Sequence, residues 1–272
     1  MPHYNRILIT GAAGRLGSQL RAGLAPLAKV IRLADREPLG PLAAHEEEAI
    51  FDLADMEAAI AATEGCDAIV HFGGAPTERE WQVILDSSIR GSYHIYEGAR
   101  KHGVKRVVYA SSVHAIGFHE IGAHISVDAP VRPDCLYGVG KTFVESLSRL
   151  YWDKHGIETA CLRIFSSFPE PADRRMLWSY LSFADCVRLV TAALTAPFVG
   201  HTIAFGTSDN TVKAVDNSRA GHLGYHPQDS SEPFRAKVEA GYPPLDPQSP
   251  AGRYLGGKFC EMPHPDDVKT GA

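Results

Sequence analysis

Tyr137 and Lys141 are the two side chains whose types and spacing most directly suggest chemistry, and they follow a serine pair, Ser111 and Ser112. A tyrosine and a lysine four positions apart share one face of a helix. A free phenol has a pKa of about 10 and is a poor base at neutral pH, whereas a nearby ammonium group favours the phenolate. This arrangement suits removal of a proton from an alcohol while a hydride leaves the same carbon. Because the spacing also arises by chance on amphipathic helices, its interpretation depends on the rest of the chain.

A glycine-rich segment, Thr10 to Gly17, lies between a short apolar run and an amphipathic stretch. Glycines in such a turn let the backbone approach a pyrophosphate, and the helix that follows directs free N–H groups at the phosphates. Asp35 closes the second apolar run, where a carboxylate binds the ribose hydroxyls of NAD and repels the 2′-phosphate of NADP. An arginine at Arg36 is the alternative signal, since it accommodates that phosphate. The residues expected to bind NAD here are Gly11, Ala13, Gly14, Arg15, Leu16, Gly17, Asp35 and Arg36.

Two further positions extend the expected cofactor site. Asp52-Leu53 follows the third apolar run, where a carboxylate can meet the adenine amino group and a helix cap is the equal alternative. Gly73 and Gly74 follow the fourth run, where small residues permit close approach to a cofactor and a plain turn is the alternative. The remaining expected cofactor contacts are Phe72, Tyr137, Lys141 and Ile164.

The elements that must hold these residues alternate along the first two-thirds of the chain. Helical stretches connect short apolar runs at residues 6–10, 30–34, 50–51, 68–72, 106–110 and 159–164. Near-continuous apolar runs of this length are typical of parallel strands buried on both faces. The sequence therefore predicts an α/β protein with a Rossmann-like, doubly wound parallel sheet.

The pattern becomes irregular after Ile164. Ser182 and Asp185 have the spacing of a capping box and predict a helix to about residue 194, and residues 201–205 predict another strand. Prolines and polar residues dominate from His226 onward. We expect residues 1–165 to form an NAD-binding domain and residues 166–272 a small substrate-binding lobe packed on it, as a single structural unit.

The overall composition argues against several classes of protein. The formal net charge of −5 and the lack of a Lys/Arg run argue against a nucleic-acid surface. No apolar run approaches the ~20 residues that span a bilayer. The five scattered cysteines lack Cys-x-x-Cys spacing, which favours reduced thiols in a cytoplasmic protein. The 13 histidines form no His-Glu-x-x-His pattern, so we expect no metal.

Taken in order, the glycine-rich turn, Asp35, Ser112 and the Tyr137/Lys141 pair resemble the extended short-chain dehydrogenase/reductase superfamily. Longer strings are similar to the uronate dehydrogenases of that superfamily, at residues 110–117, 132–138, 163–166, 169–171, 175–177, 216–218 and 256–259. Such enzymes oxidise the anomeric hydroxyl of galacturonate or glucuronate to a lactone with NAD. The similarity spans nearly the whole chain.

This resemblance implies a role for each candidate residue. Ser112 would hydrogen-bond the reacting hydroxyl, Tyr137 would act as general base and Lys141 would hold the nicotinamide ribose. Arg175 would clamp the sugar carboxylate through two parallel hydrogen bonds. The implied substrate-binding residues are Ala75, Ser111, Ser112, Val113, His114, Tyr137, Ser166 and Arg175. The open alternatives are a satisfied loop histidine for His114, a local backbone cap for Ser166, and a solvated pair for Arg174 and Arg175.

Four positions depart from the resembled pattern. Val113 stands in place of an asparagine, Pro76 in place of a serine and Phe165 in place of a glycine. Ser88 occupies the position of an asparagine that commonly supports a proton-relay water. A hydroxyl-binding site that loses donors can change its preference strongly. We therefore expect intact catalytic chemistry beside a rebuilt sugar pocket.

The expected activity is NAD-dependent oxidation of the C1 hydroxyl of an acidic hexose, a uronate or a similar C6-anionic sugar, by a homo-oligomer. A nucleotide-sugar epimerase or dehydratase is the first alternative. Epimerases and dehydratases usually need a larger C-terminal lobe, and the dehydratases place an acidic residue near the catalytic serine, where Val113-His114 offers none. The second alternative is an NAD-binding regulatory protein without catalysis, a class that tends to lose the Tyr/Lys pair.

Overall fold

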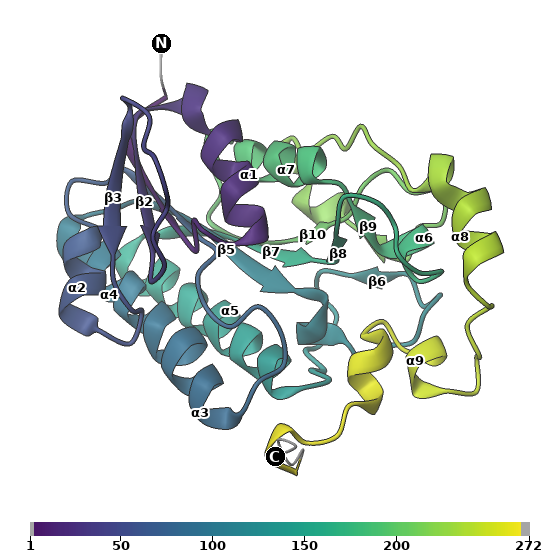
Figure 1. The fold of residues 1–272 in the computed structure, drawn as a ribbon. Coiled ribbons are helices and arrows are strands. Elements are labelled where there is room, and N and C mark those ends of the chain that lie inside the picture. Colours follow the sequence, from purple (N-terminus) through teal and green to yellow (C-terminus); the bar gives the residue numbers. More distant parts are fainter. Residues whose placement is uncertain (1–2, 268–272) are drawn as a thin grey trace.

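The computed structural model describes residues 3–267 of the chain. Its centre is a parallel sheet of seven strands in the order β10-β7-β5-β4-β1-β2-β3 (Figure 1). These strands are β1 (Tyr4–Thr10), β2 (Ala28–Asp35), β3 (Glu46–Ile50), β4 (Ala68–His71), β5 (Arg106–Ser112), β7 (Glu158–Ile164) and β10 (His201–Gly206). The chain runs outward from β1 in one direction and then outward from β4 in the other, so the sheet has a switch point between these strands. The predicted Rossmann-like, doubly wound sheet is confirmed.

Helices cover both faces of the sheet (Figure 1). One face carries α1 (Arg15–Gly23) and α7 (Phe183–Thr195), and the other carries α2 (Met56–Ala62), α4 (Gly91–His102) and α5 (Leu136–His155). Each face buries its own apolar cluster, with Leu20 and Leu189 in the first and Tyr96 and Val144 in the second. Burial of these clusters is the main force that holds the helices on the sheet.

A long helix precedes β5 and changes its winding midway. α3 (Trp81–Val83) continues as a π-helix (Ile84–Arg90) and then as α4, so residues 81–102 form one continuous helix. Single π-helical turns are frequent at functional sites. This one carries the buried Ser88, whose Oγ accepts the N–H of Ala75 at 3.2 Å.

The third strand is longer than the sequence predicts. Only residues 50–51 show an apolar run, whereas β3 begins at Glu46. Because β3 lies at the edge of the sheet, its side chains are charged, and Glu46 and Glu47 form ion pairs with Arg21 and Arg32. Charges are typical of edge strands and remove the apolar signal that marks the central ones.

Residues beyond 165 also build part of the central sheet. α7 starts at its predicted cap, where Ser182 Oγ accepts the N–H of Asp185 at 2.9 Å, and β10 occupies the predicted strand at residues 201–205. The smaller elements are β6 (Ile125–Ser126), β8 (Ser166–Ser167), β9 (Tyr180–Leu181), β11 (Val215–Asp216), α6 (Met176–Ser179), α8 (Arg235–Gly241) and α9 (Pro250–Arg253). Phe165, Trp178 and Leu255 belong to a third apolar cluster. Across residues 3–267, none of the helices has the length and apolar character to cross a membrane.

Candidate active site

The expected site residues meet at the carboxyl edge of the sheet, on both sides of the switch point. The glycine-rich turn follows β1, Asp35 ends β2, Gly73 lies just after β4, and Ser112 ends β5. Ligands of open α/β sheets bind in the crevice at this position.

Close backbone packing explains two glycines of the turn after β1. Gly11 has a φ of +72°, and a Cβ there would lie 2.7 Å from the carbonyl carbon of Phe72. A Cβ on Gly17 would lie 2.0 Å from the oxygen of Gly11, so only glycine lets α1 start tight against β1. At Gly14 no side chain of the described residues caps α1. The first N–H groups of this helix therefore remain for an anion.

Asp35 is held at the mouth of this turn. Its Oδ2 accepts the N–H of Ala13 at 2.9 Å, and its Oδ1 accepts the N–H groups of Arg36 at 2.8 Å and Glu37 at 3.2 Å. The exposed Arg36 guanidinium lies 3.6 Å from the Glu37 carboxylate. The turn, the uncapped helix and the fixed carboxylate together fit the phosphates and ribose of a dinucleotide.

The other expected cofactor residues lie along the neighbouring strand ends. Asp52 Oδ1 accepts the N–H of Ala54 at 2.8 Å in the turn before α2, whereas the helix itself is capped by Asp55, so the helix-cap alternative for Asp52 is wrong. A Cβ on Gly73 would lie 2.9 Å from the Leu53 side chain, so the small residue is required there. The side chains of Leu16, Phe72 and Ile164 pack in or against the apolar cluster under α1.

His71 supports this edge of the sheet and was missed by the sequence reasoning. Its Nδ1 lies 2.7 Å from Thr10 Oγ1, and its Nε2 lies 3.0 Å from Ser92 Oγ. Burial lowers the pKa of His71 to about 3, so the ring stays neutral and links β1 to α4. A lone histidine in an apolar strand gives no signal of this role in the sequence.

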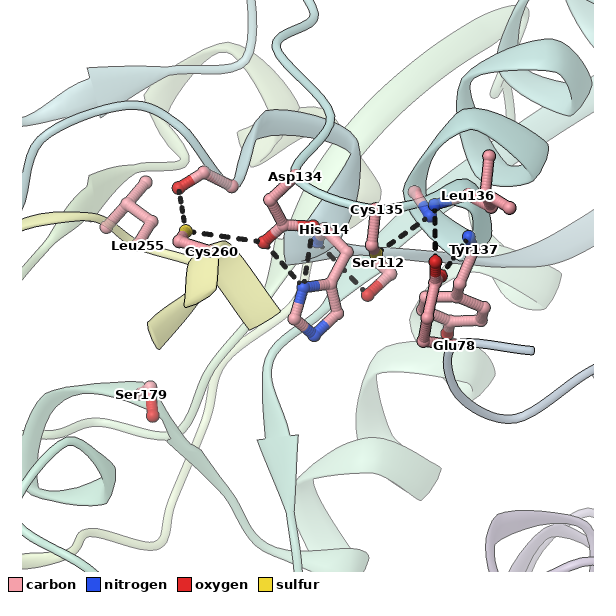
Figure 2. A network of polar contacts seen from close by, with 12 residues as sticks. Glu78, Ser112, His114, Asp134, Cys135, Leu136, Tyr137, Ser179, Leu255 and Cys260 are labelled. Carbon is pink, nitrogen blue, oxygen red and sulfur yellow. Dashed lines mark hydrogen bonds and ion pairs between the residues drawn. The ribbon is translucent and has the colours of Figure 1, made fainter. Parts of the chain in front are cut away.

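Ser112, Tyr137 and Lys141 come together where β5 ends beside the first turns of α5, and Figure 2 shows the first two. Lys141 Nζ donates to the oxygen of Ala110 at 2.7 Å and lies 5.1 Å from the centroid of the Tyr137 ring. The Ser112 hydroxyl acts on the phenol of Tyr137 and lowers its pKa. The structure thus assembles the group of residues that proton abstraction from an alcohol requires.

Desolvation dominates the electrostatics of this group. Desolvation raises the pKa of Tyr137 to about 12, although the hydrogen bond from Ser112 lowers it. Burial lowers the pKa of Lys141 to about 8, although the Glu145 carboxylate raises it. In this structure desolvation therefore outweighs the interactions that favour the phenolate, and the expected joint effect of Lys141 and an oxidised nicotinamide stays a prediction.

Ser111 faces the opposite side of β5 from Ser112, since side chains alternate along a strand. Its Oγ donates to Glu145 Oε1 at 2.6 Å, and Glu145 Oε2 lies 2.9 Å from Arg163 Nη2 in a buried ion pair. A substrate contact by the Ser111 side chain is therefore contradicted, and only its backbone is left for that role. The ion pair ties α5 to β7 one turn beyond Lys141, and no spacing in the sequence indicates it.

Arg175 lies at the start of α6 among neutral acceptors. Its Nη1 donates to Ser166 Oγ at 2.7 Å, and its Nε donates to the oxygen of Leu255 at 3.0 Å, which Nη2 also contacts. Ser166 Oγ lies 2.9 Å from the Oγ of the buried Ser179, a partner that sequence reasoning missed. Burial lowers the pKa of Arg175. These contacts exclude the alternative of a solvated arginine pair with Arg174.

His114 faces Tyr137 from the loop after β5, with ring centroids 5.7 Å apart (Figure 2). Phe259 stacks on the histidine at a centroid distance of 3.9 Å. His114 Nδ1 lies 2.8 Å from Oδ2 of the buried Asp134 carboxylate. Nε2 makes no hydrogen bond within residues 3–267, so it is the ring nitrogen left for a ligand. Asp134 and Phe259 were not predicted, because they come from distant segments.

His114, Asp134 and Cys135 place a nitrogen, an oxygen and a sulfur atom within 4.8 Å of one another. Each of the three already has a hydrogen-bond partner, since Cys135 Sγ accepts the N–H of Gly138 at 3.3 Å. Burial raises the pKa of the Cys135 thiol, and it raises that of nearby Cys260 to about 12. Both thiols therefore favour the protonated form, whereas metal ligands are thiolates.

Two of the departures from the resembled pattern lie in one apolar cluster. Val113 and Phe165 are both buried there with Trp178 and Phe205, and the Phe165 ring meets each of these two aromatic rings edge-on. The Val113 side chain points into this cluster, so its expected contact with substrate is left to its backbone. Ala75, the remaining expected substrate residue, is buried and donates its N–H to Ser88.

Known proteins share both the sequence and the fold of this chain. The pattern of the NAD dependent epimerase/dehydratase family matches residues 7–182. A uronate dehydrogenase of Pseudomonas putida is 50% identical over 94% of this chain and 96% of its own length. The solved structure of a mutated uronate dehydrogenase is 48% identical, covers 98% of this chain and 97% of that chain, and has a TM-score of 0.96. A tyrosine-to-alanine mutant of the Agrobacterium tumefaciens uronate dehydrogenase, complexed with NAD, is 45% identical with a TM-score of 0.92, over 95% of this chain and 98% of that chain. The chain therefore belongs to the NAD dependent epimerase/dehydratase family.

Proposed function

We propose that this protein is an NAD-dependent dehydrogenase that oxidises the C1 hydroxyl of a hexuronate to the aldonolactone. The observation that supports it best is Arg175, which is partly buried and forms no ion pair among residues 3–267, although Asp173 and Asp134 act on it from farther away. A desolvated cation that is not directly paired favours an anionic ligand. The similarity to uronate dehydrogenases supports the same class of substrate.

In the proposed reaction, each of these side chains of the crevice has a separate role. When bound, oxidised NAD supplies the hydride acceptor for the C1 hydrogen and a positively charged ring that favours the Tyr137 phenolate. Tyr137 Oη takes the proton of the C1 hydroxyl, and Ser112 Oγ holds that hydroxyl in place. Lys141, fixed on the oxygen of Ala110, adds positive charge beside the phenol.

We further propose a division of binding along the chain. Residues 1–165 supply the dinucleotide contacts, which are the turn after β1, Asp35 and the loop after β4. Residues 166–272 supply the anion contacts through Ser166 and Arg175, although β10 from this part completes the central sheet and α7 packs on one face of it. Asp35, held by the N–H of Ala13, supports a preference for NAD over NADP.

The proposed function is tested by mixing the protein with NAD and a panel of sugars while following NADH absorbance. Galacturonate and glucuronate should give turnover, and galactose and glucose should give far less. Replacing NAD by NADP should lower kcat/KM. Turnover of a neutral alcohol, with none of any acidic sugar, would contradict the proposal.

Arg175→Ala tests the anion contact within that assay. Loss of a charge-assisted hydrogen bond costs about 2 kcal/mol, so KM for a hexuronate should rise about 30-fold. Arg174→Ala is the matched control, because Arg174 donates only to the oxygens of Glu239 and Tyr242. Equal effects of Arg175→Ala on acidic and neutral sugars would refute the role.

Assembly and location are proposals of the same kind. We propose a homo-oligomer, supported by exposed apolar side chains on the helices that precede and follow β5. These are Trp81, Val83, Tyr93, Val139, Phe143 and Leu150. Light scattering during gel filtration measures the molecular mass.

A cytoplasmic location is supported by the five cysteines, all of which are free.

A further inference from the structure

The first turn of α5 needs hydrogen-bond acceptors from outside the helix. The first bond within the helix runs from the N–H of Val139 to the oxygen of Cys135 at 3.0 Å. The N–H groups of Leu136, Tyr137 and Gly138 precede it and have no carbonyl of their own. The Cys135 thiol takes the Gly138 N–H at 3.3 Å, and sulfur is a weak acceptor. Two donors remain, one of them on Tyr137 itself.

Glu78 supplies both missing acceptors from another part of the chain (Figure 2). Its Oε1 accepts the N–H of Leu136 at 3.0 Å, and its Oε2 accepts the N–H of Tyr137 at 2.7 Å. A carboxylate at the start of a helix also interacts favourably with the helix dipole. One side chain thus fixes the backbone at the position that holds the phenol.

The loop that carries Glu78 is anchored on the dinucleotide side of the crevice. It follows β4, and the N–H of Gly73 donates to Thr10 Oγ1 at 3.1 Å. The N–H of Ala75 donates to Ser88 Oγ at 3.2 Å. Only two residues separate Ala75 from Glu78, so a short, tethered segment spans from the glycine-rich turn to α5.

We propose that Glu78 is a positioning residue, which holds Tyr137 against Ser112 and ties that position to the loop after β4. The proposal rests on the proposed function, in which Tyr137 is the general base. Without the carboxylate, the first turn of α5 loses two acceptors, and the phenol can move away from Ser112. The Ser112 hydrogen bond lowers the pKa of Tyr137, so its loss makes the phenol harder to ionise.

The other groups around Tyr137 stay in place when Glu78 is changed. Lys141 lies on the same helix, His114 faces the ring from the loop after β5, and Asp134 and Cys135 raise the phenol pKa from the segment before α5. Removal of a negative charge alone lowers the pKa of a nearby phenol. Loss of position and loss of charge therefore shift the pH dependence in opposite directions.

The kinetic test compares Glu78→Ala and Glu78→Gln with Glu80→Gln. Glu80 is exposed, and its side chain caps no helix. Glu80→Gln removes the same charge as Glu78→Gln, two residues farther along the loop. In Glu78→Ala we expect kcat to fall at least about tenfold while KM for NAD and hexuronate changes less than about threefold. The acidic limb of the kcat profile should move to higher pH. Glu78→Gln keeps one acceptor oxygen and should recover part of kcat, and Glu80→Gln should match the parent protein.

Amide hydrogen exchange gives a readout that does not depend on turnover. The N–H groups of Leu136 and Tyr137 should exchange faster in Glu78→Ala and unchanged in Glu80→Gln. Any of three results would overturn the proposal. The acidic limb of the kcat profile could move to lower pH, the kcat profile could stay unchanged while only Tm falls, or amide exchange at Leu136 and Tyr137 could stay unchanged. If the parent protein oxidises no acidic sugar, the proposed function fails, and exchange at these two amides still decides whether Glu78 holds the turn.

Discussion

Lys141 keeps a positive charge in a place where water is scarce, since only 6% of the residue is exposed. Its pKa of about 8 lies below the ordinary value of 10.5, so the folded protein disfavours the charged form that dominates at neutral pH. The same desolvation keeps the Tyr137 phenol protonated. The charged Lys141 therefore carries a desolvation cost at neutral pH, whereas the neutral Tyr137 phenol carries none.

Replacement of Lys141 should expose this cost. The pKa of Lys141 is about 8 in the folded protein and 10.5 in the unfolded chain, so the charged lysine destabilises the fold below about pH 8. This cost shrinks as the pH rises from about 8 to 10.5 and is absent above pH 10.5. Lys141→Met should therefore raise the free energy of unfolding at pH 7 by about 1–2 kcal/mol, after the loss of the bond to Ala110, and this gain should vanish above pH 10.5. Urea denaturation at both pH values measures it. A less stable variant at pH 7 would contradict the argument, and turnover should be lost in either case.

The pH dependence of turnover should follow Tyr137. Because the active form is the phenolate and desolvation raises the pKa to about 12, kcat should rise with pH across the neutral range. The rise should weaken above pH 8, where Lys141 with its pKa of about 8 gives up its proton. Tyr137→Phe should remove activity at every pH. A kcat that is flat from pH 6 to 8 would show that another group, or product release, limits the rate.

At the scale of elements, α5 is held by two charged side chains and one hydroxyl that come from three other segments. Glu78 caps its first turn, Arg163 on β7 pairs with Glu145 beyond Lys141, and Ser111 on β5 donates to that same carboxylate. A buried pair contributes little net stability when complete, but a single broken partner leaves a charge unpaired in the interior.

Breaking this pair should therefore destabilise the protein strongly. Arg163→Met leaves the Glu145 carboxylate buried without its cation, which should cost about 3–5 kcal/mol of unfolding free energy. The matched control is Arg149→Met, which removes an exposed ion pair with Asp153 on the same helix and should leave the free energy of unfolding nearly unchanged. Chemical denaturation of both variants measures the free energy of unfolding, and equal losses in the two variants would contradict the prediction.

Sequence patterns located the parts of this site that depend on local spacing. The apolar runs placed the central strands, and the positions of Ser112 at a strand end and of Tyr137 and Lys141 one turn apart brought the three together. Four residues of the site could not be predicted, because each acts through a partner on a distant segment. They are Glu78, His71, Asp134 and Ser179. The desolvation that raises the pKa of the phenol is likewise a property of packing.

At the scale of the whole molecule, the segment around Leu255 closes over the site from near the C-terminal end of the described chain. Leu255 accepts from Arg175, the N–H of Gly256 donates to Gly117, and Phe259 stacks on His114. This segment, together with β10 in the central sheet, makes residues beyond 165 part of both the core and the crevice.

Phe259→Ala should test how the closing segment contributes. Loss of the ring from the face of His114 should raise KM for a hexuronate about fivefold, near 1 kcal/mol, while KM for NAD stays unchanged. Phe198→Ala is the control, because that ring is 60% exposed and packs on Trp152. A change in KM for NAD alone would mean that Phe259 acts on the dinucleotide side of the crevice, which would contradict the prediction.

The shared cluster of Val113 and Phe165 bears on how this protein can change over evolutionary time. Val113→Asn alone would bury an amide against Trp178 and Phe205, and Phe165→Gly alone would open a cavity there. Each reversal toward the resembled pattern is then harmful on the present background. We therefore expect the two substitutions to be non-additive, so a library that varies these positions one at a time would miss a pocket that needs both changes.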